Sequence, residues 1–193
     1  REPESINGKL AFYALDAVTP LTDGSWKAAL NGVSVALSGL DVVRGGARTA
    51  FSLCRPPGHH AYADRANGFT YLNNGAIAAQ CLLETHRRVA ILDIDVHHGN
   101  GTQGIFWRRR DVLTVSLHGD PHFCTPFFTG HAHEIGEGDG LGYNRNLPLA
   151  RGTDDAGYQL ALDDALMTVR TYAPAALVVA LGLDAHERDP YRA

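Results

Sequence analysis

Four short apolar segments of the chain have the pattern of buried β-strands. Each is an apolar run that contains β-branched residues and ends at a polar residue, a glycine or a proline. These segments cover residues 49–54, 89–96, 112–117 and 175–183. Because their apolar residues are continuous rather than alternating, we expect both faces of the resulting sheet to be covered.

Three longer segments have the properties of helices. They cover residues 26–40, 74–84 and 153–172, and the middle one is rich in alanine. In the last segment apolar residues recur every three or four positions, which places them on one face of a helix. Thr153 is predicted to cap this helix, and Asp154 and Asp155 favour the same end through the helix dipole.

The order of these segments predicts the fold class. Helices alternate with strands along the chain, which indicates an α/β fold with a mostly parallel sheet flanked by helices. In such folds functional residues gather at the carboxyl ends of the strands. Residues 119–147 contain six glycines and little periodicity, so we predict one long functional loop there.

Composition narrows the class of protein. A chain of 193 residues with 45% hydrophobic residues fits one domain. The net charge of −4 and the absence of a long basic block argue against nucleic acid as a direct partner. No apolar run approaches the roughly 20 residues of a membrane span. Three scattered cysteines favour a reducing compartment, so we expect a cytoplasmic protein.

One strand end carries ionisable residues at every second position. If the strand continues, Asp93, Asp95 and His97 point to one face, where burial is costly unless the groups are paired or bind a metal. Asp184 ends another apolar segment, so Asp95, His97 and Asp184 form a candidate metal site with an open position. Alternatively, the aspartates cap loops and the histidine is an ordinary strand-end residue.

A second cluster, Arg55-Pro-Pro-Gly-His-His60, presents two adjacent imidazoles in a sharp loop. Two such rings can divide the work of general base and general acid, because imidazole titrates near neutral pH. Each ring needs an orienting partner. Asp93 and Asn100 are candidates, and a carboxylate raises the basicity of a ring more than an amide does.

These motifs resemble the histone deacetylase superfamily, in particular its acetylpolyamine amidohydrolase and class II-like bacterial deacetylase branch. The matching blocks are residues 55–61, 68–74, 91–102, 112–118, 134–138 and 181–186, which span nearly the whole chain. The resemblance implies an arginase/deacetylase-like α/β fold. It also implies that residues 1–193 are an internal fragment of a single catalytic domain, truncated at both ends, which would fold poorly and show little activity alone.

The resemblance also implies roles for individual residues. Zinc ligands would be Asp95, His97 and Asp184; catalytic residues would be His59 with its partner Asp93 and His60 with its partner Asn100. Walls of a substrate tunnel would be Gly68, Phe69, Phe127 and Phe128. One structural potassium site would use Asp93, Asp95, His97, Ser116 and Leu117, and a second would use Phe106, Arg109, Val112 and Tyr143.

The function implied by the resemblance is zinc-dependent hydrolysis of the acetyl amide of acetylpolyamines or similar amines. Acetyl-lysine in proteins is the alternative substrate, and a two-metal arginase-like ureohydrolase or an inactive metal-binding relative are further alternatives. Fe(II) also suits two carboxylates and one imidazole. A homodimer is implied for the full-length protein. The family's oxyanion-stabilising tyrosine has no match here, because Tyr191 is too close to Asp184.

Overall fold

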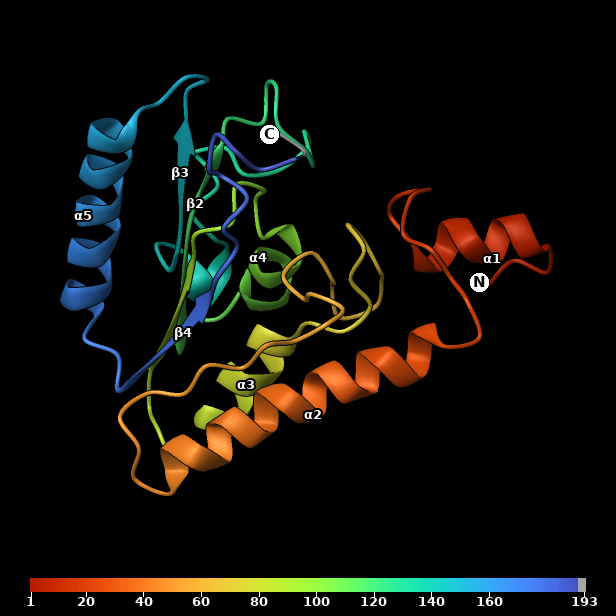
Figure 1. The fold of residues 1–193 in the computed structure, drawn as a ribbon, viewed down its shortest axis with the longest axis horizontal. Helices are drawn as coiled ribbons and strands as arrows, with labels where there is room; N and C mark the ends of the chain where they lie inside the picture. Colours follow the sequence, from red (N-terminus) through yellow and green to blue (C-terminus); the bar gives the residue numbers. More distant parts are fainter. Residues whose placement is uncertain (191–193) are drawn as a thin grey trace.

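The computed structural model describes residues 1–190 as helices packed around one sheet (Figure 1). The elements are α1 (Ile6–Tyr13), α2 (Ser25–Arg44), α3 (Asn74–Leu82), β1 (Val89–Asp93), α4 (Asn100–Phe106), β2 (Val112–Gly119), the 3-10 helix η1 (Gly138–Gly140), β3 (Asn144–Leu149), α5 (Asp155–Tyr172) and β4 (Ala176–Ala180). Within residues 1–190, no helix is both long and apolar enough to cross a membrane.

All four strands run parallel, in the order β3-β2-β1-β4. Val89 at the start of β1 is in register with Val112 of β2 and with Ala176 of β4. This register brings the carboxyl ends of β1, β2 and β4 to one edge, where ligands bind in open α/β sheets. The predicted α/β fold with a parallel sheet flanked by helices is confirmed.

Helices cover the two faces of the sheet in separate layers (Figure 1). On β1, Val89 and Ile91 pack into a core that includes residues of α2, α3 and α4. Ala90 and Leu92 point the other way and pack into the core beneath α5. All five residues of β1 and all eight of β2 are buried, so these central strands explain the continuous apolar runs in the sequence.

Two of the predicted elements are wrong, and the strands predicted at 89–96 and 175–183 are shorter in the structure, at Val89–Asp93 and Ala176–Ala180. Residues 49–54 form no strand and pair with no strand among residues 1–190, and Phe51 and Leu53 are exposed. The predicted loop 119–147 contains η1 and most of β3. The strand β3 was not predicted because its sequence includes Asn144, Asn146 and Pro148, which have low strand propensity.

Three smaller expectations also need correction. Asp154, not Thr153, caps α5, and its side chain accepts a hydrogen bond from the backbone N–H of Gly157. The expectation that both faces are covered fails for β4, whose residues alternate between half-buried and exposed. The short helices α1 and α4 were not predicted; α1 buries none of its residues.

Candidate active site

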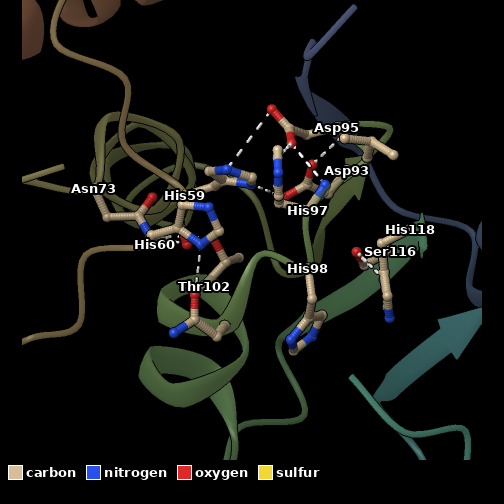
Figure 2. A network of polar contacts seen from close by, with 12 residues as sticks. His59, His60, Asn73, Asp93, Asp95, His97, His98, Thr102, Ser116 and His118 are labelled. Carbon is tan, nitrogen blue, oxygen red and sulfur yellow. Dashed lines mark hydrogen bonds and ion pairs between the residues drawn. The ribbon is translucent and has the colours of Figure 1, made fainter. Parts of the chain in front are cut away.

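Two adjacent histidines lie beside the carboxyl end of β1, and each is hydrogen-bonded to a different partner (Figure 2). Nδ1 of His59 lies 2.8 Å from Oδ2 of Asp93, the last residue of β1. Nδ1 of His60 lies 2.6 Å from Oδ1 of Asn100, the first residue of α4. The centroids of the two imidazole rings are 4.0 Å apart. The pairs are those that the resemblance implied, with a carboxylate for one ring and an amide for the other.

The different partners separate the protonation states of the two rings. Burial alone would lower the pKa of His59, but the neighbouring Asp93 carboxylate outweighs it and raises the pKa to about 9. Burial, together with the positive charge on His59, lowers the pKa of His60 to about 3. Near neutral pH the site therefore holds one protonated and one neutral imidazole, the arrangement of a matched general acid and general base.

Asp95, His97 and Asp184 converge beside the histidine pair. One candidate ligand atom from each lies within 4.8 Å of the others. Nδ1 of His97 is 3.1 Å from Oδ1 of Asp95 and 3.0 Å from Oδ2 of Asp184. Hydrogen bonds to Asp184 and Asp95 raise the pKa of His97 to about 10. Two carboxylates and one imidazole fit a divalent cation such as zinc, which would displace that proton.

Neighbouring parallel strands position this group of candidate metal ligands. β1 ends at Asp93, so the expectation that Asp93, Asp95 and His97 share one face of a continuing strand is wrong. Instead, Asp95 and His97 lie on the loop that follows β1, and Asp184 follows the adjacent β4. Oδ1 of Asp184 accepts a hydrogen bond of 3.0 Å from the backbone N–H of Val96, which ties the two loops together.

The start of α4 packs directly against the loop that holds the two histidines. The side-chain amide of Asn100 donates to Oδ1 of Asn67 at 2.9 Å, which orients its own oxygen toward His60. A Cβ atom at Gly101 would overlap the backbone carbonyl of Ala61. Close approach at Gly101 therefore allows α4 to bring Asn100 within reach of the imidazole.

The predicted tunnel residues lie on two separate loops. Gly68 and Phe69 belong to a loop whose backbone N–H groups donate to the side chains of Asp16 and Thr19. Phe69 and Phe127 both adopt left-handed backbone conformations, with φ of 63° and 62°, which is uncommon for bulky residues. Phe69, Phe127 and Phe128 are exposed, with 55–57% of their surface accessible. Such aromatic side chains are available to contact a ligand.

Comparison with known proteins identifies the family. The model of the histone deacetylase domain matches residues 2–193. The chain belongs to the histone deacetylase family. Its relatives include acetylpolyamine amidohydrolase 2 of Pseudomonas aeruginosa, which is 53% identical over 190 residues that cover 98% of this chain and 55% of the relative. This histone deacetylase domain therefore spans about half the length of such curated relatives.

Solved structures of the family agree with the fold. The crystal structure of acetylpolyamine aminohydrolase from Burkholderia pseudomallei has a TM-score of 0.93 and 50% identity, and the match covers 98% of this chain and 56% of that one. The structure of a histone deacetylase homologue from Aquifex aeolicus has a TM-score of 0.76 and 36% identity, covering 88% of this chain and 44% of that one. The histone deacetylase fold is thus shared beyond the acetylpolyamine enzymes.

The residues of the implied potassium sites occupy two regions of this histone deacetylase domain. Asp93 is in register with Ser116 on the neighbouring strand, and Leu117 follows Ser116 on β2. The second set lies around the connection from α4 to β2, where the backbone N–H of Arg109 donates to the carbonyl of Phe106. Val112 begins β2, and the carbonyl of Tyr143 accepts a hydrogen bond from the neighbouring Thr114.

A second polar cluster, which the sequence patterns did not predict, contains His98, the neighbour of the candidate ligand His97, together with His118. His98 and His118 are buried with their ring centroids 4.6 Å apart. Nδ1 of His118 lies 2.8 Å from the Ser116 hydroxyl, and its Nε2 donates to the carbonyl of Gly130 at 2.9 Å. His98 adjoins the predicted ligand His97, which was the one available signal. Tyr191 lies outside the described residues.

Proposed function

We propose that the protein containing this chain is a metal-dependent amidohydrolase that removes acetyl groups from acetylpolyamines or similar small acetylated amines. The observation that carries the proposal is the placement of two histidines, one bonded to a carboxylate and one to an amide, beside a three-ligand group. Nε2 of His59 lies 3.7 Å from Oδ2 of Asp95, and the ring centroids of His60 and His97 are 6.1 Å apart. An amide bound beside the three ligands would lie within reach of both imidazoles.

The hydrogen bonds assign a task to each imidazole. Oδ1 of Asn100 can only accept, so it fixes the proton of His60 on Nδ1 and leaves Nε2 free to take a proton from water. His59 is protonated, and its Nε2–H is available to donate to the leaving amine. Asp93 stabilises this charged form of His59. When bound by Asp95, His97 and Asp184, a zinc ion would polarise the carbonyl and acidify water.

Relatives support the choice of substrate class. Four relatives named acetylpolyamine amidohydrolase are 46–53% identical to this chain. Relatives named as histone deacetylases or histone deacetylase-like are 40–43% identical. Acetyl-lysine in a protein is therefore the second candidate substrate, and the exposed phenylalanines of the two loops suit the methylene chain of either molecule.

We extend the proposal to the remaining components. Zinc is the proposed metal, and the same three ligands also suit Fe(II). The two sets of residues identified by the resemblance are proposed to hold structural potassium. A homodimer is proposed for the full-length protein. The cytoplasm is the proposed location, which agrees with three cysteines that are all free thiols.

The test uses the natural protein that contains this chain, loaded with zinc. It is assayed on acetylputrescine, acetylspermidine and an acetyl-lysine peptide. We expect the free polyamines to have the higher kcat/KM. Asp184→Ala should abolish turnover and remove one equivalent of bound zinc, whereas Asp139→Ala, at an exposed carboxylate, should change neither. Preference for the peptide would favour the second candidate, and zinc binding without turnover of any substrate would refute deacetylation.

A further inference from the structure

The carboxylate of Glu134 joins three separate parts of the chain. Its Oε2 atom accepts hydrogen bonds from Nε2 of Gln103 at 2.9 Å, from the backbone N–H of Gly130 at 2.8 Å and from Nδ2 of Asn146 at 3.3 Å. Gln103 belongs to α4 and Asn146 to β3, while Gly130 lies in the loop between β2 and η1. One carboxylate therefore ties this loop to a helix and a strand beneath it.

The donors to Glu134 are themselves held in place. Gln103 and Asn146 are buried, with 7% and 3% of their surface exposed. Oε1 of Gln103 accepts from Nδ2 of Asn144 at 2.9 Å and from Nδ2 of Asn146 at 2.8 Å, so the three amides form a continuous network. Nδ2 of Asn144 also donates to the backbone carbonyl of Glu134 at 2.6 Å. Both the backbone and the side chain of Glu134 are thus fixed from below.

Hydrogen bonds, not a cation, satisfy the charge of Glu134. Among residues 1–190 no arginine, lysine or histidine forms an ion pair with it. A half-buried carboxylate depends on its donors when no cation is close, and hydrogen bonds to a charged acceptor are roughly twice as strong as neutral ones. The position of Glu134 and the position of the Gly130 amide are therefore strongly coupled.

The coupled loop carries two of the proposed tunnel residues. Gly130 follows Phe127 and Phe128 within three positions. Gly130 has φ of 103°, and a Cβ atom there would overlap the rings of His98 and His118. Its carbonyl accepts a hydrogen bond from His118 and its N–H donates one to Glu134. Both backbone polar groups of Gly130 are therefore hydrogen-bonded. Little freedom remains at the end of the Phe127–Phe128 segment.

We infer that Glu134 is a positioning residue, which fixes the loop that carries Phe127 and Phe128 and thereby sets the fit of the substrate's methylene chain. The role of this loop in substrate binding rests on the proposed function. Among residues 1–190, the side chain of Glu134 forms no hydrogen bond or ion pair with the histidine pair or the three-ligand group, and its link to this loop is the bond to Gly130. Its loss should therefore weaken substrate binding without slowing the chemical step.

The experiment compares Glu134→Gln and Glu134→Ala in the zinc-loaded natural protein. Glu137→Gln is the matched control, because Glu137 lies on the same loop but pairs with the exposed Arg108. Hydrogen–deuterium exchange of the peptides covering residues 120–137 reports on the loop. We expect hydrogen exchange at Gly130 to be faster than in the wild type in both Glu134 variants. In Glu137→Gln the exchange rate should equal that of the wild type. KM for acetylputrescine should rise roughly tenfold, which corresponds to about 1.4 kcal/mol, with kcat changed less than about twofold.

The two arms separate the inference from the proposed function. Unchanged exchange at Gly130 in Glu134→Gln overturns the inference, as does a fall in kcat with KM unchanged. A wild-type protein that hydrolyses none of the substrates refutes the proposed function. The exchange rate at Gly130 then shows whether Glu134 holds the loop in place. Thermal unfolding identifies variants that do not fold; if Glu134→Ala is one, the isosteric Glu134→Gln carries the test.

Discussion

Replacing Asp93 by asparagine should reverse the protonation state of His59 at neutral pH. The substitution keeps the size of the side chain and an oxygen that can accept from Nδ1 of His59 across the 2.8 Å contact. It removes the negative charge, which is the chief influence that raises the pKa of this buried ring. Burial, which favours the neutral form and is the largest single influence on this ring, is then opposed by the smaller attraction of the Asp95 carboxylate. His59 should lose its proton and with it the capacity to act as an acid.

The size of the effect follows from the pKa of His59. The value of about 9 exceeds the ordinary 6.5 by 9 − 6.5 = 2.5 units. At about 1.36 kcal/mol per unit, this difference is roughly 3 kcal/mol in favour of the protonated ring. Since burial remains in the variant, we expect its His59 to titrate at or below 6.5. At pH 7.5 the ring would change from mostly protonated to mostly neutral.

Nitrogen-15 NMR of the histidine side chains measures this directly in the natural protein and its variant. Both are titrated after treatment with a chelator, because a bound cation would add its own field. The His59→Gln variant assigns the signal. Asp111→Asn is the control, because Asp111 pairs with Arg109 ahead of β2 and away from the histidines. If His59 in Asp93→Asn still titrated near pH 9, the attribution of its protonation to Asp93 would be refuted.

Three further predictions concern the same pair. Asn100→Asp should raise the pKa of His60 from about 3 by roughly 1–3 units, because a carboxylate then faces Nδ1; NMR titration would detect no shift if the amide were not its partner. Gly101→Ala should lower kcat/KM by pushing α4 away from the Ala61 carbonyl, and wild-type activity would contradict that close approach. His59, whose pKa is raised, stabilises the fold fully below pH 6.5 and loses this contribution as the pH rises through about 9. The difference in unfolding free energy between wild type and His59→Gln, measured with urea, should therefore shrink over that range.

The elements that could be predicted are those in which burial follows the regular spacing of residues in a strand or a helix. β1 and β2 are fully buried, so their continuous apolar runs were sufficient to find them. The helix α5 keeps an apolar stripe because it packs on one face of the sheet. Polar residues after apolar segments also led to the three-ligand group, since parallel strands bring distant carboxyl ends together. The histidine pair was found from two adjacent imidazoles in a loop rich in proline and glycine.

The elements that could not be predicted depend on contacts between distant residues. β3 is polar because Asn144 and Asn146 face Gln103, and no local pattern indicates that partner. The helix α4 contains two glycines, which disfavour helices, and its position against the histidine loop depends on one of them. Conversely, residues 49–54 have the composition of a strand without a partner strand among residues 1–190.

The three candidate metal ligands come from distant parts of the sequence, which affects when the site can form during synthesis. His97 and Asp184 are separated by 184 − 97 = 87 positions, although their side chains are 3.0 Å apart. During translation at about 5–20 residues per second, the first two ligands would emerge several seconds before the third. A tight three-ligand site cannot exist until β4 has docked beside β1. Tight binding of a metal ion would thus indicate that β4 has paired with β1. A nascent chain stalled before Asp184 should bind the ion only weakly.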